Sequence, residues 1–359
     1  MKKLFLPFLT LSLAVFLNSC SNNEDTMSED ISKNIAQSYD VYVAGRENNK
    51  ACYWKNNVKT DLTNGDNLIP LDITVQNNNV YVTGSNGSTP TTLKPIHYFW
   101  KNGTRNEIKQ YLNLPNSGLS GITSFTVNNG DIYFAGYVEN PTATSAFEQY
   151  ELCYWKNGVK TILYKSQYVP SAEGIEITNS ATGSDVYVSA MIADNNQNVD
   201  RGYFKNTTFN SLNQPSFVFN FAKNTNGLHI LFQKNSKYYS KNIFTNVETL
   251  IGNYTLPIPF YGKITTDTET NDLYTMYYNQ GNNYYKNTTT VNPSFSSLPY
   301  IQDLFALDNK IYMVKYDTPN STYTGKVFVN GVESQSITST QNSSQNYTGT
   351  FNAIYVVKN

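Results

Sequence analysis

One short sequence motif, here called the Lys phrase, recurs along the chain and indicates the fold. Two of its copies are Tyr53-Trp54-Lys55-Asn56 and Tyr154-Trp155-Lys156-Asn157-Gly158. The other five copies, some of them degraded, are Phe99-Trp100-Lys101-Asn102-Gly103, Tyr203-Phe204-Lys205-Asn206, Tyr239-Ser240-Lys241-Asn242, Tyr284-Tyr285-Lys286-Asn287 and Val327-Phe328-Val329-Asn330-Gly331. Repeats of about 40–50 residues that consist of short strands are typical of propellers and related arrays.

A second phrase precedes each copy of the first, as in Asp131-Ile132-Tyr133-Phe134. Its other copies are Asp40-Val41-Tyr42-Val43, Asn79-Val80-Tyr81-Val82, Asp185-Val186-Tyr187-Val188, Gly227-Leu228-His229-Ile230, Asp272-Leu273-Tyr274-Thr275 and Lys310-Ile311-Tyr312-Met313. Each repeat reads as four strands, and the Asn-Gly or Asn-Asn pair after the Lys phrase predicts the tight turn between the last two. The fold class is therefore all-β, with four-stranded blades.

The two ends of the repeat region complement each other. The pattern begins at a second strand near Tyr39, whereas the last residues, 353–359, match a first strand. Pairing of the C-terminal strand into the N-terminal blade would close the ring and remove exposed sheet edges. We therefore expect a seven-bladed β-propeller over residues 38–359. The alternative is eight blades, if the segment 137–180 contains an additional one.

The repeated aromatic residues and two of the cysteines are best interpreted as packing residues. Alternation along a strand places Tyr53 and Trp54 on opposite faces of the blade, where neighbouring blades cover both. Cys52 and Cys153 precede Tyr-Trp at the same repeat position in blades that are not adjacent. Their Cα atoms would lie beyond the roughly 7 Å limit for a disulfide, so we expect two buried free thiols.

The N-terminus has the features of an export signal. Lys2 and Lys3 precede an apolar run that is too short to span a bilayer as a stable helix, and Cys20 follows directly after it. The sequence around Cys20 resembles the lipobox of bacterial lipoproteins. This resemblance implies that residues 1–19 are a lipoprotein signal peptide and that the Cys20 thiol is acylated. Residues 20–37 are polar and predict a flexible acylated tether. An ordinary signal peptide is the alternative.

Composition argues against nucleic-acid binding. The formal net charge is −1, only 15% of residues are charged, and no basic cluster stands out. Nucleic-acid binding needs a positive surface that faces the phosphates. The chain contains 29 Tyr and 19 Phe, which favour strands and fit an all-β protein. The partners we expect are a membrane, through the lipid anchor, and a glycan or protein ligand.

No catalytic constellation is evident in the sequence. His229 stands where the other repeats carry Tyr, and His97 has no second ligand near it in sequence. The aspartates before the second strands recur in one context, which favours turn capping over catalysis. We expect no cofactor, with one weak exception. Asp194, Asn196, Asn198 and Asp200 alternate in one loop and could supply oxygen ligands to Ca²⁺, although a solvated Asn-rich loop explains them more simply.

The candidate binding surface is one rim of the propeller. The longest loops between second and third strands occur in consecutive blades, at 85–95, 137–149 and 191–200, so they should form one raised wall. Its candidate binding residues, with those of the inter-blade connections, are Tyr137, Glu139, Phe147, Tyr168, Asp194 and Asp200. Aromatic rings beside carboxylates suit sugar rings and protein partners equally well.

The whole chain after the signal resembles the propellers of Bacteroidota lipoproteins that carry the Tyr-Trp-Lys-Asn-Gly repeat. This resemblance implies a fold and a location at the outer membrane, on its periplasmic or cell-surface side. We expect a non-enzymatic, membrane-anchored binding or scaffold protein that engages its ligand through blades 2–4. The alternatives are a polysaccharide-degrading lyase or hydrolase of propeller fold and an envelope-assembly factor.

Overall fold

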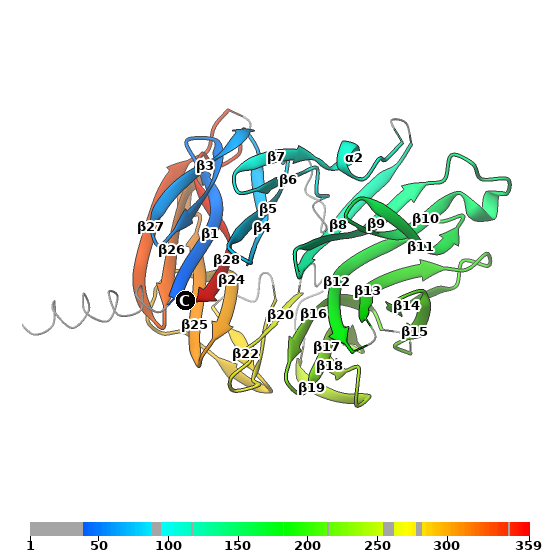
Figure 1. Ribbon diagram of the computed structural model, residues 1–359. Helices are drawn as coiled ribbons and strands as arrows, with labels where there is room; N and C mark the ends of the chain where they lie inside the picture. Colours follow the sequence, from blue (N-terminus) through cyan, green and yellow to red (C-terminus); the bar gives the residue numbers. More distant parts are fainter. Residues whose placement is uncertain are drawn as a thin grey trace, which may run out of the picture.

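Seven four-stranded antiparallel sheets are arranged in a ring as a β-propeller (Figure 1). The computed structural model describes residues 39–87, 95–115, 118–181, 183–213, 215–253, 262–277, 282–343 and 345–359. The predicted signal peptide, Cys20 and the tether lie outside these residues. The blades are numbered here in chain order, and the expectation of seven rather than eight is confirmed.

The strands of blades 1 to 4 follow from the centre of the ring outward. Blade 1 contains β28 (Thr350–Lys358), β1 (Tyr39–Glu47), β2 (Lys50–Lys55) and β3 (Val58–Asp66). Blade 2 contains β4 (Ile69–Gln76), β5 (Asn79–Ser85), β6 (Tyr98–Lys101) and β7 (Thr104–Glu107). Blade 3 contains β8 (Ser120–Asn128), β9 (Asp131–Glu139), β10 (Tyr150–Lys156) and β11 (Val159–Ser166). Blade 4 contains β12 (Ser171–Ser180), β13 (Gly183–Ala193), β14 (Val199–Lys205) and β15 (Thr208–Ser211).

Blades 5 to 7 have the same order. Blade 5 contains β16 (Phe217–Asn224), β17 (Gly227–Lys234), β18 (Lys237–Asn242) and β19 (Val247–Asn253). Blade 6 contains β20 (Gly262–Thr266), β21 (Leu273–Tyr277), β22 (Tyr284–Lys286) and β23 (Thr289–Val291). Blade 7 contains β24 (Tyr300–Leu307), β25 (Lys310–Asp317), β26 (Thr322–Val329) and β27 (Val332–Thr340). The short helices are α2 (Ile108–Tyr111), η1 (Ala146–Glu148) and η2 (Pro319–Ser321).

The C-terminal strand closes the ring as predicted. β28 is the innermost strand of blade 1 and pairs antiparallel with β1, so that Tyr355 lies opposite Tyr42. In Figure 1 the red β28 runs beside the blue β1. Strands from the two ends of the chain thus share one sheet, and the first blade cannot form without the last residues.

Each interface between neighbouring blades contains its own apolar cluster, seven clusters in all. Trp155 of blade 3 packs with Tyr81 and Phe99 of blade 2, and its side chain is fully buried. Trp54 packs against blade 7, whereas Tyr53 packs in the cluster shared with blade 2. The two aromatic residues of the phrase therefore face opposite neighbours, and their assignment to inter-blade packing is confirmed. Cys52 and Cys153 are likewise buried and free.

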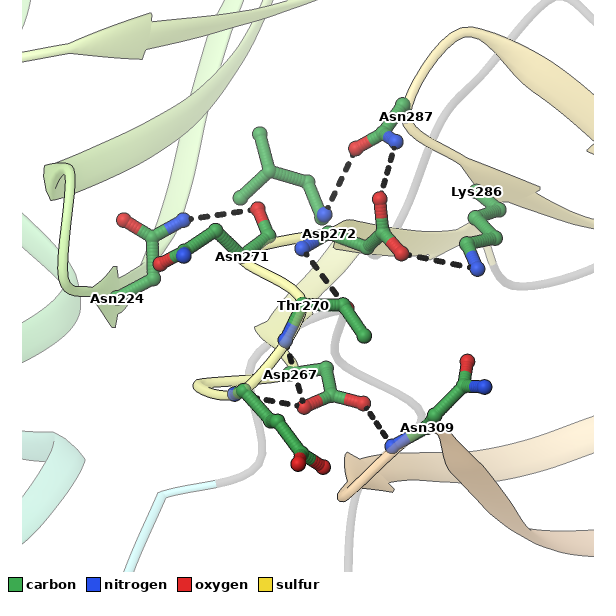
Figure 2. Close-up of polar contacts among 10 residues, drawn as sticks. Asn224, Asp267, Thr270, Asn271, Asp272, Lys286, Asn287 and Asn309 are labelled. Atoms are coloured by element: carbon green, nitrogen blue, oxygen red, sulfur yellow. Dashed lines mark hydrogen bonds and ion pairs between the residues drawn. The ribbon is translucent and has the colours of Figure 1, made fainter.

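The polar residues of the two phrases form a clasp between the second and third strands. In blade 3, Asn157 Oδ1 accepts the N–H of Ile132 at 2.8 Å, and its Nδ2 donates to Asp131 Oδ1 at 2.7 Å. Lys156 completes the clasp with an ion pair to Asp131 at 2.7 Å and lies over the ring of Tyr133. Figure 2 shows the corresponding contacts of Asp272, Lys286 and Asn287 in blade 6.

The same clasp recurs in blade 1 with Asp40, Lys55 and Asn56, and in blade 4 with Asp185, Lys205 and Asn206. The Asn side chain thus satisfies a backbone donor at the start of the second strand while its own φ lies near +50°. Asn tolerates this left-handed conformation better than most other residues. The repeated phrase is therefore a folding device.

Turns at the clasp end also link neighbouring blades. In blade 6, Asp267 is fully buried; its Oδ1 accepts the N–H of Glu269, and its Oδ2 accepts the N–H of Asn309 in blade 7 at 2.5 Å. On the other side, Asn224 of blade 5 donates to the carbonyl of Asn271 at 3.0 Å. Figure 2 shows both links around one turn. Blades 5, 6 and 7 are thereby held in register.

Candidate functional site

The end of the propeller opposite the clasps carries the connections that differ most between blades. We call it the rim face; it contains the connections from second to third strands and those from fourth strands to the next blade. The second-to-third connection is residues 48–49 in blade 1 and 235–236 in blade 5, but 140–149 in blade 3. Among the described connections of this kind, the one in blade 3 is therefore much longer than those in blades 1 and 5.

Two of the predicted loops are shorter than expected because their strands continue further. Tyr137 and Glu139 belong to β9, where Glu139 pairs with Tyr150, and Asp200 belongs to β14, where it pairs with Ile192. The loop of blade 4 is reduced to residues 194–198. Most of the predicted blade 2 loop, residues 88–94, lies outside the described residues. Strand pairing across the repeat thus extends past the positions where the phrases end.

The connections of blades 3 and 4 are fastened to each other. The Tyr164 hydroxyl and the Ser166 hydroxyl both donate to the carbonyl of Ala193, at 3.2 and 3.1 Å. Gln167 donates to the carbonyl of Asn195 at 3.3 Å, and the Tyr168 N–H donates to Ser166 Oγ. The structure therefore brings Tyr168 close to the Asp194 loop. A surface held by such bonds loses little conformational entropy when a partner binds.

The carboxylates of this surface are occupied by their own loops. Asp194 accepts the N–H groups of Asn196 and Asn198 and the Asn198 amide, and these bonds lower its pKa. Asp200 accepts the Ser211 hydroxyl at 2.8 Å. The Asp194 carboxylate thus acts as a loop cap. In the described part of the chain, no three His, Cys, Asp or Glu side chains gather in a way that could hold a metal ion.

Five of the exposed large apolar side chains belong to segments of the rim face. They are Leu119 (54% exposed), Phe147 (49%), Val169 (41%), Val199 (46%) and Phe217 (41%). All five lie in connections or at strand ends between blades 2 and 5. The Glu139 N–H donates to the Leu119 carbonyl, and the Glu139 carboxylate accepts the Leu119 N–H at 2.9 Å.

A separate groove of about 570 Å³ lies at the outer side of blade 2, lined by Asn64, Arg105, Asn106, Glu107, Gln110 and Tyr111. The Arg105 guanidinium lies 4.0 Å from the centre of the Tyr98 ring and donates to the carbonyl of Asn64 at 2.7 Å. It also pairs with Glu107. Arg105 is therefore fixed in place, and the groove offers mainly amide groups.

The first strands place a second set of polar residues around the central channel. Six of them contain a bulge near the rim face, and the bulged residues include Thr123, Glu173, Gln302 and Asn352. Asn352 donates to the carbonyl of Pro70 in blade 2 at 2.7 Å, and Thr123 donates to that of Ala172 in blade 4 at 2.5 Å. Bulges of this kind aim side chains at functional positions.

Strand register places further side chains at two levels of the first strands, which we call the upper and lower tiers. In the upper tier, Asp72, Ser124 and Asp303 directly follow a bulge, and Lys263 lies at the same level in β20, which pairs with β21 without a bulge. The lower tier lies opposite the repeated Tyr of each second strand and includes Thr74, Glu176, Phe305 and Tyr355. The sequence analysis missed both tiers, because no phrase repeats in the first strands. Counting back from the repeated Tyr would have located the lower tier.

The upper tier contains one satisfied carboxylate and one that is nearly bare. Asp303 accepts Lys263 Nζ at 2.5 Å, the Leu304 N–H at 2.8 Å and the Ile354 N–H at 2.9 Å. Asp72 accepts only the N–H of its own neighbour, Ile73, among the bonds of the described residues. Burial raises the pKa of Asp72, although the nearby charge of Lys263 lowers it. The Asp72 residue is nevertheless exposed to solvent, so its carboxyl can be hydrated without a protein partner.

The lower tier repeats this situation at Glu176. Its carboxyl accepts the N–H of Ile177 at 3.0 Å, and burial raises its pKa against the opposing charge of Lys223. Burial raises the pKa of the Tyr355 phenol. At the bulge, burial raises the pKa of Glu173 to about 7.

The remaining candidate groups are dispersed. His229 and His97 belong to blades 5 and 2, and burial lowers the pKa of both. Burial raises the pKa values of Cys52 and Cys153 to about 12, which makes them poor nucleophiles. Among the described residues, no helix is long and apolar enough to cross a membrane.

No protein-family model matches this chain, and no curated protein matches it. Solved structures resemble it at low identity. The Nidogen/Laminin complex aligns at 10% identity and TM-score 0.40, covering 89% of this chain and 98% of that chain. Apo AztD from Citrobacter koseri aligns at 10% identity and TM-score 0.43, with the same coverage. The extracellular domain of the putative one component system BT4673 from B. thetaiotaomicron aligns at 9% identity and TM-score 0.39, covering 87% of this chain and 46% of that chain. These likenesses carry no argument about function.

Proposed function

We propose that this chain is a non-enzymatic binding or scaffold protein whose rim face, over blades 2–4, engages a macromolecular partner. The observation that carries the proposal is the group of exposed apolar residues formed by Leu119, Phe147, Val169, Val199 and Phe217. Three of the five are aliphatic, which favours a protein partner over a sugar ring, since sugars stack best on aromatic faces. Because hydrogen bonds hold the connections of blades 3 and 4 together, this surface would need little rearrangement to bind a partner.

The test compares two sets of substitutions that remove similar apolar area. The rim variant carries Phe147→Ser, Val169→Ser and Val199→Ser. The control variant carries Val58→Ser, Val159→Ser and Val332→Ser, which are 70%, 70% and 36% exposed on outer strands. Partners are captured from envelope extracts on the immobilised full chain, and glycan arrays are probed in parallel. We expect the control variant to keep the captured protein and the rim variant to lose it. Retention by the rim variant would refute the proposal, and selective glycan binding would change the ligand class.

We also propose that Cys20 carries the lipid that anchors the protein to the outer membrane. The support is the sequence around Cys20, which resembles a lipobox. One or more acyl chains hold a protein at a membrane without a spanning helix. Metabolic labelling with a fatty acid and membrane fractionation of Cys20→Ala test this. We expect loss of label and release from the membrane fraction; a labelled Cys20→Ala chain would exclude the assignment.

A second candidate function is polysaccharide cleavage. The observation that favours it is Glu173, since a carboxyl with a pKa near 7 can serve as a general acid at neutral pH. It lies at the bulge of β12, close to Arg201, whose charge acts on it. Product release from a polysaccharide panel, abolished by Glu173→Gln, would establish this function. Equal release by the wild-type and Glu173→Gln chains would rule Glu173 out as the acid.

A further inference from the structure

The outer strand of blade 2 departs from the repeat in two ways. It runs directly into α2, and no other fourth strand continues into a helix within the described residues (Figure 1). It also carries Arg105 opposite Trp100, where blade 4 carries Phe209 opposite Phe204. The rings of Phe204 and Phe209 pack with centres 5.0 Å apart, so the packing of a blade does not require an arginine at this position.

Packing fixes α2 against blades 2 and 3. Ile108 at its start is buried. The Tyr111 ring at its end packs edge-on against Phe99, with ring centres 4.9 Å apart, and lies 6.2 Å from the ring of Phe134 in blade 3. The part of the groove that α2 contributes is therefore held in a defined position.

The two walls of the groove belong to different blades and are joined by hydrogen bonds. Asn64 of β3 forms the wall in blade 1, and the other lining residues belong to β7 and α2 of blade 2. The Thr63 hydroxyl donates to the Gly103 carbonyl at 2.9 Å and accepts the Arg105 N–H at 3.0 Å. These bonds hold both walls in place without a ligand, so binding requires little additional ordering.

Several polar groups of the lining are available to a ligand. The side-chain amides of Asn64 and Gln110 and the hydroxyl of Tyr111 form no hydrogen bond with other described residues. Arg105 uses one N–H of one Nη atom for the Asn64 carbonyl and one of the other for Glu107, so each Nη atom keeps one N–H. These groups converge from two blades on one volume of about 570 Å³, a size usual for small-molecule sites.

The chemistry of the lining selects a neutral ligand that is rich in hydroxyl groups. The six lining residues include no aliphatic side chain, so the groove offers no pocket to the apolar side chains of a peptide. Arg105 and Glu107 pair with each other, which leaves little net charge to hold an anion or a cation. Amides and a phenol both donate and accept hydrogen bonds, as sugar hydroxyls do.

We propose that the groove between blades 1 and 2 binds a neutral oligosaccharide, whose hydroxyls bond to Asn64, Asn106, Gln110 and Tyr111, with Arg105 as a further donor. The sugar is held through its hydroxyl groups and not through stacking on an aromatic face. None of the six lining residues belongs to the apolar group on the rim face. The proposal is therefore independent of the protein partner proposed above, and either can fail alone.

Isothermal titration calorimetry of the full chain tests the proposal. The probes are maltotriose, cellotriose, xylotriose and mannotriose, and the controls are trigalacturonic acid, the glucosamine trimer and tetraalanine. We expect at least one neutral trimer to bind and no control to bind. Asn64→Gly, Gln110→Ala and Tyr111→Phe should each weaken that binding about three- to tenfold, since each removes one hydrogen bond. These variants should fold, because Gly accepts the φ of +51° at position 64 and Phe keeps the ring packing at position 111.

A matched pair of variants separates ligand contact from structural effects. The Asn106 amide donates to the carbonyl of Thr104 at 3.3 Å, and the Asn210 amide of blade 4 donates to that of Thr208 at 3.1 Å. Asn106→Ala and Asn210→Ala therefore lose the same bond within a fourth strand, but only Asn106 lines the groove. We expect Asn106→Ala alone to weaken sugar binding.

The rim variant with Phe147→Ser, Val169→Ser and Val199→Ser should keep full affinity for the sugar. Loss of sugar binding in that variant would place the sugar on the rim face and overturn the proposal. So would the absence of heat with every neutral trimer, tighter binding of a charged control or of tetraalanine than of the neutral trimers, or equal affinity in Asn106→Ala and Asn210→Ala.

Discussion

The clasp permits a quantitative prediction of which repeated residue stabilises the blade. Replacing Asn157 with Ala removes two hydrogen bonds, from the Ile132 N–H and to Asp131 Oδ1. It also places Ala at φ +49°, a left-handed conformation. Two net hydrogen bonds contribute about 2 kcal/mol. The left-handed backbone adds about 1 kcal/mol. We therefore expect Asn157→Ala to lower the free energy of unfolding by about 2–3 kcal/mol.

Matched variants divide this loss into its causes. Asn157→Gly loses the same bonds but tolerates the positive φ, so it should cost about 1 kcal/mol less than the Ala variant. Lys156→Met should cost less than about 1 kcal/mol, because its ion pair to Asp131 is largely exposed and screened. Thermal unfolding followed by circular dichroism, with urea titrations for the slopes, measures all three. The reasoning fails if Lys156→Met costs as much as Asn157→Ala, or if the Ala and Gly variants are equally stable.

Three further predictions follow from single features of the structure. Lys315 is fully buried, and burial lowers its pKa to about 8 from the ordinary 10.5. Between pH 8 and pH 10.5, Lys315 is therefore protonated in the unfolded chain but largely neutral in the folded chain. Stability should therefore rise as the pH passes above 8, and Lys315→Met should stabilise the protein at pH 7 by about 1–3 kcal/mol and flatten this rise in urea titrations. The pKa of Glu173 is raised to about 7 from 4.5, because burial disfavours its charged form. The folded state therefore loses stability as the pH rises from 4.5 through 7, where the buried carboxyl must ionise. Glu173→Gln should raise the melting temperature at pH 8 but not at pH 4. Ending the chain after Gly349 removes β28 and leaves β1 as an open inner edge; this variant should be insoluble, and recovery of a soluble, cooperatively melting chain would contradict the closure argument.

The sequence predicted those parts of the fold in which a side chain forms hydrogen bonds to residues of its own blade. Asn157 contacts Ile132 and Asp131, which belong to the same blade, so the phrase recurs wherever the clasp recurs. The aromatic residues recur for the same reason, because each blade presents the same two faces to its neighbours. Seven repeats and a strand missing from one end were then enough to predict the ring and its closure.

The channel could not be predicted in this way. Asp72 and Glu176 lie in blades 2 and 4, and bulges shift the first strands relative to their partners. Neither residue stands in a repeated phrase, so no pattern in the sequence marks its position. Of the predicted rim residues, Phe147, Tyr168 and Asp194 lie in connections. Tyr137, Glu139 and Asp200 belong to strands, because pairing extends beyond the repeated positions.

The two faces of the propeller are under different physical constraints. Every clasp lies at the turns that join third to fourth strands and first to second strands, so the bonds that specify the repeat are concentrated opposite the rim face. No such clasp is found on the rim face of the described residues, and its second-to-third connections differ in length, as 48–49 in blade 1 and 140–149 in blade 3 show. Because stability is secured at one end, length and composition can change at the other at little cost to folding. The rim connections are therefore the part of such a fold that can acquire a binding function without weakening the blades.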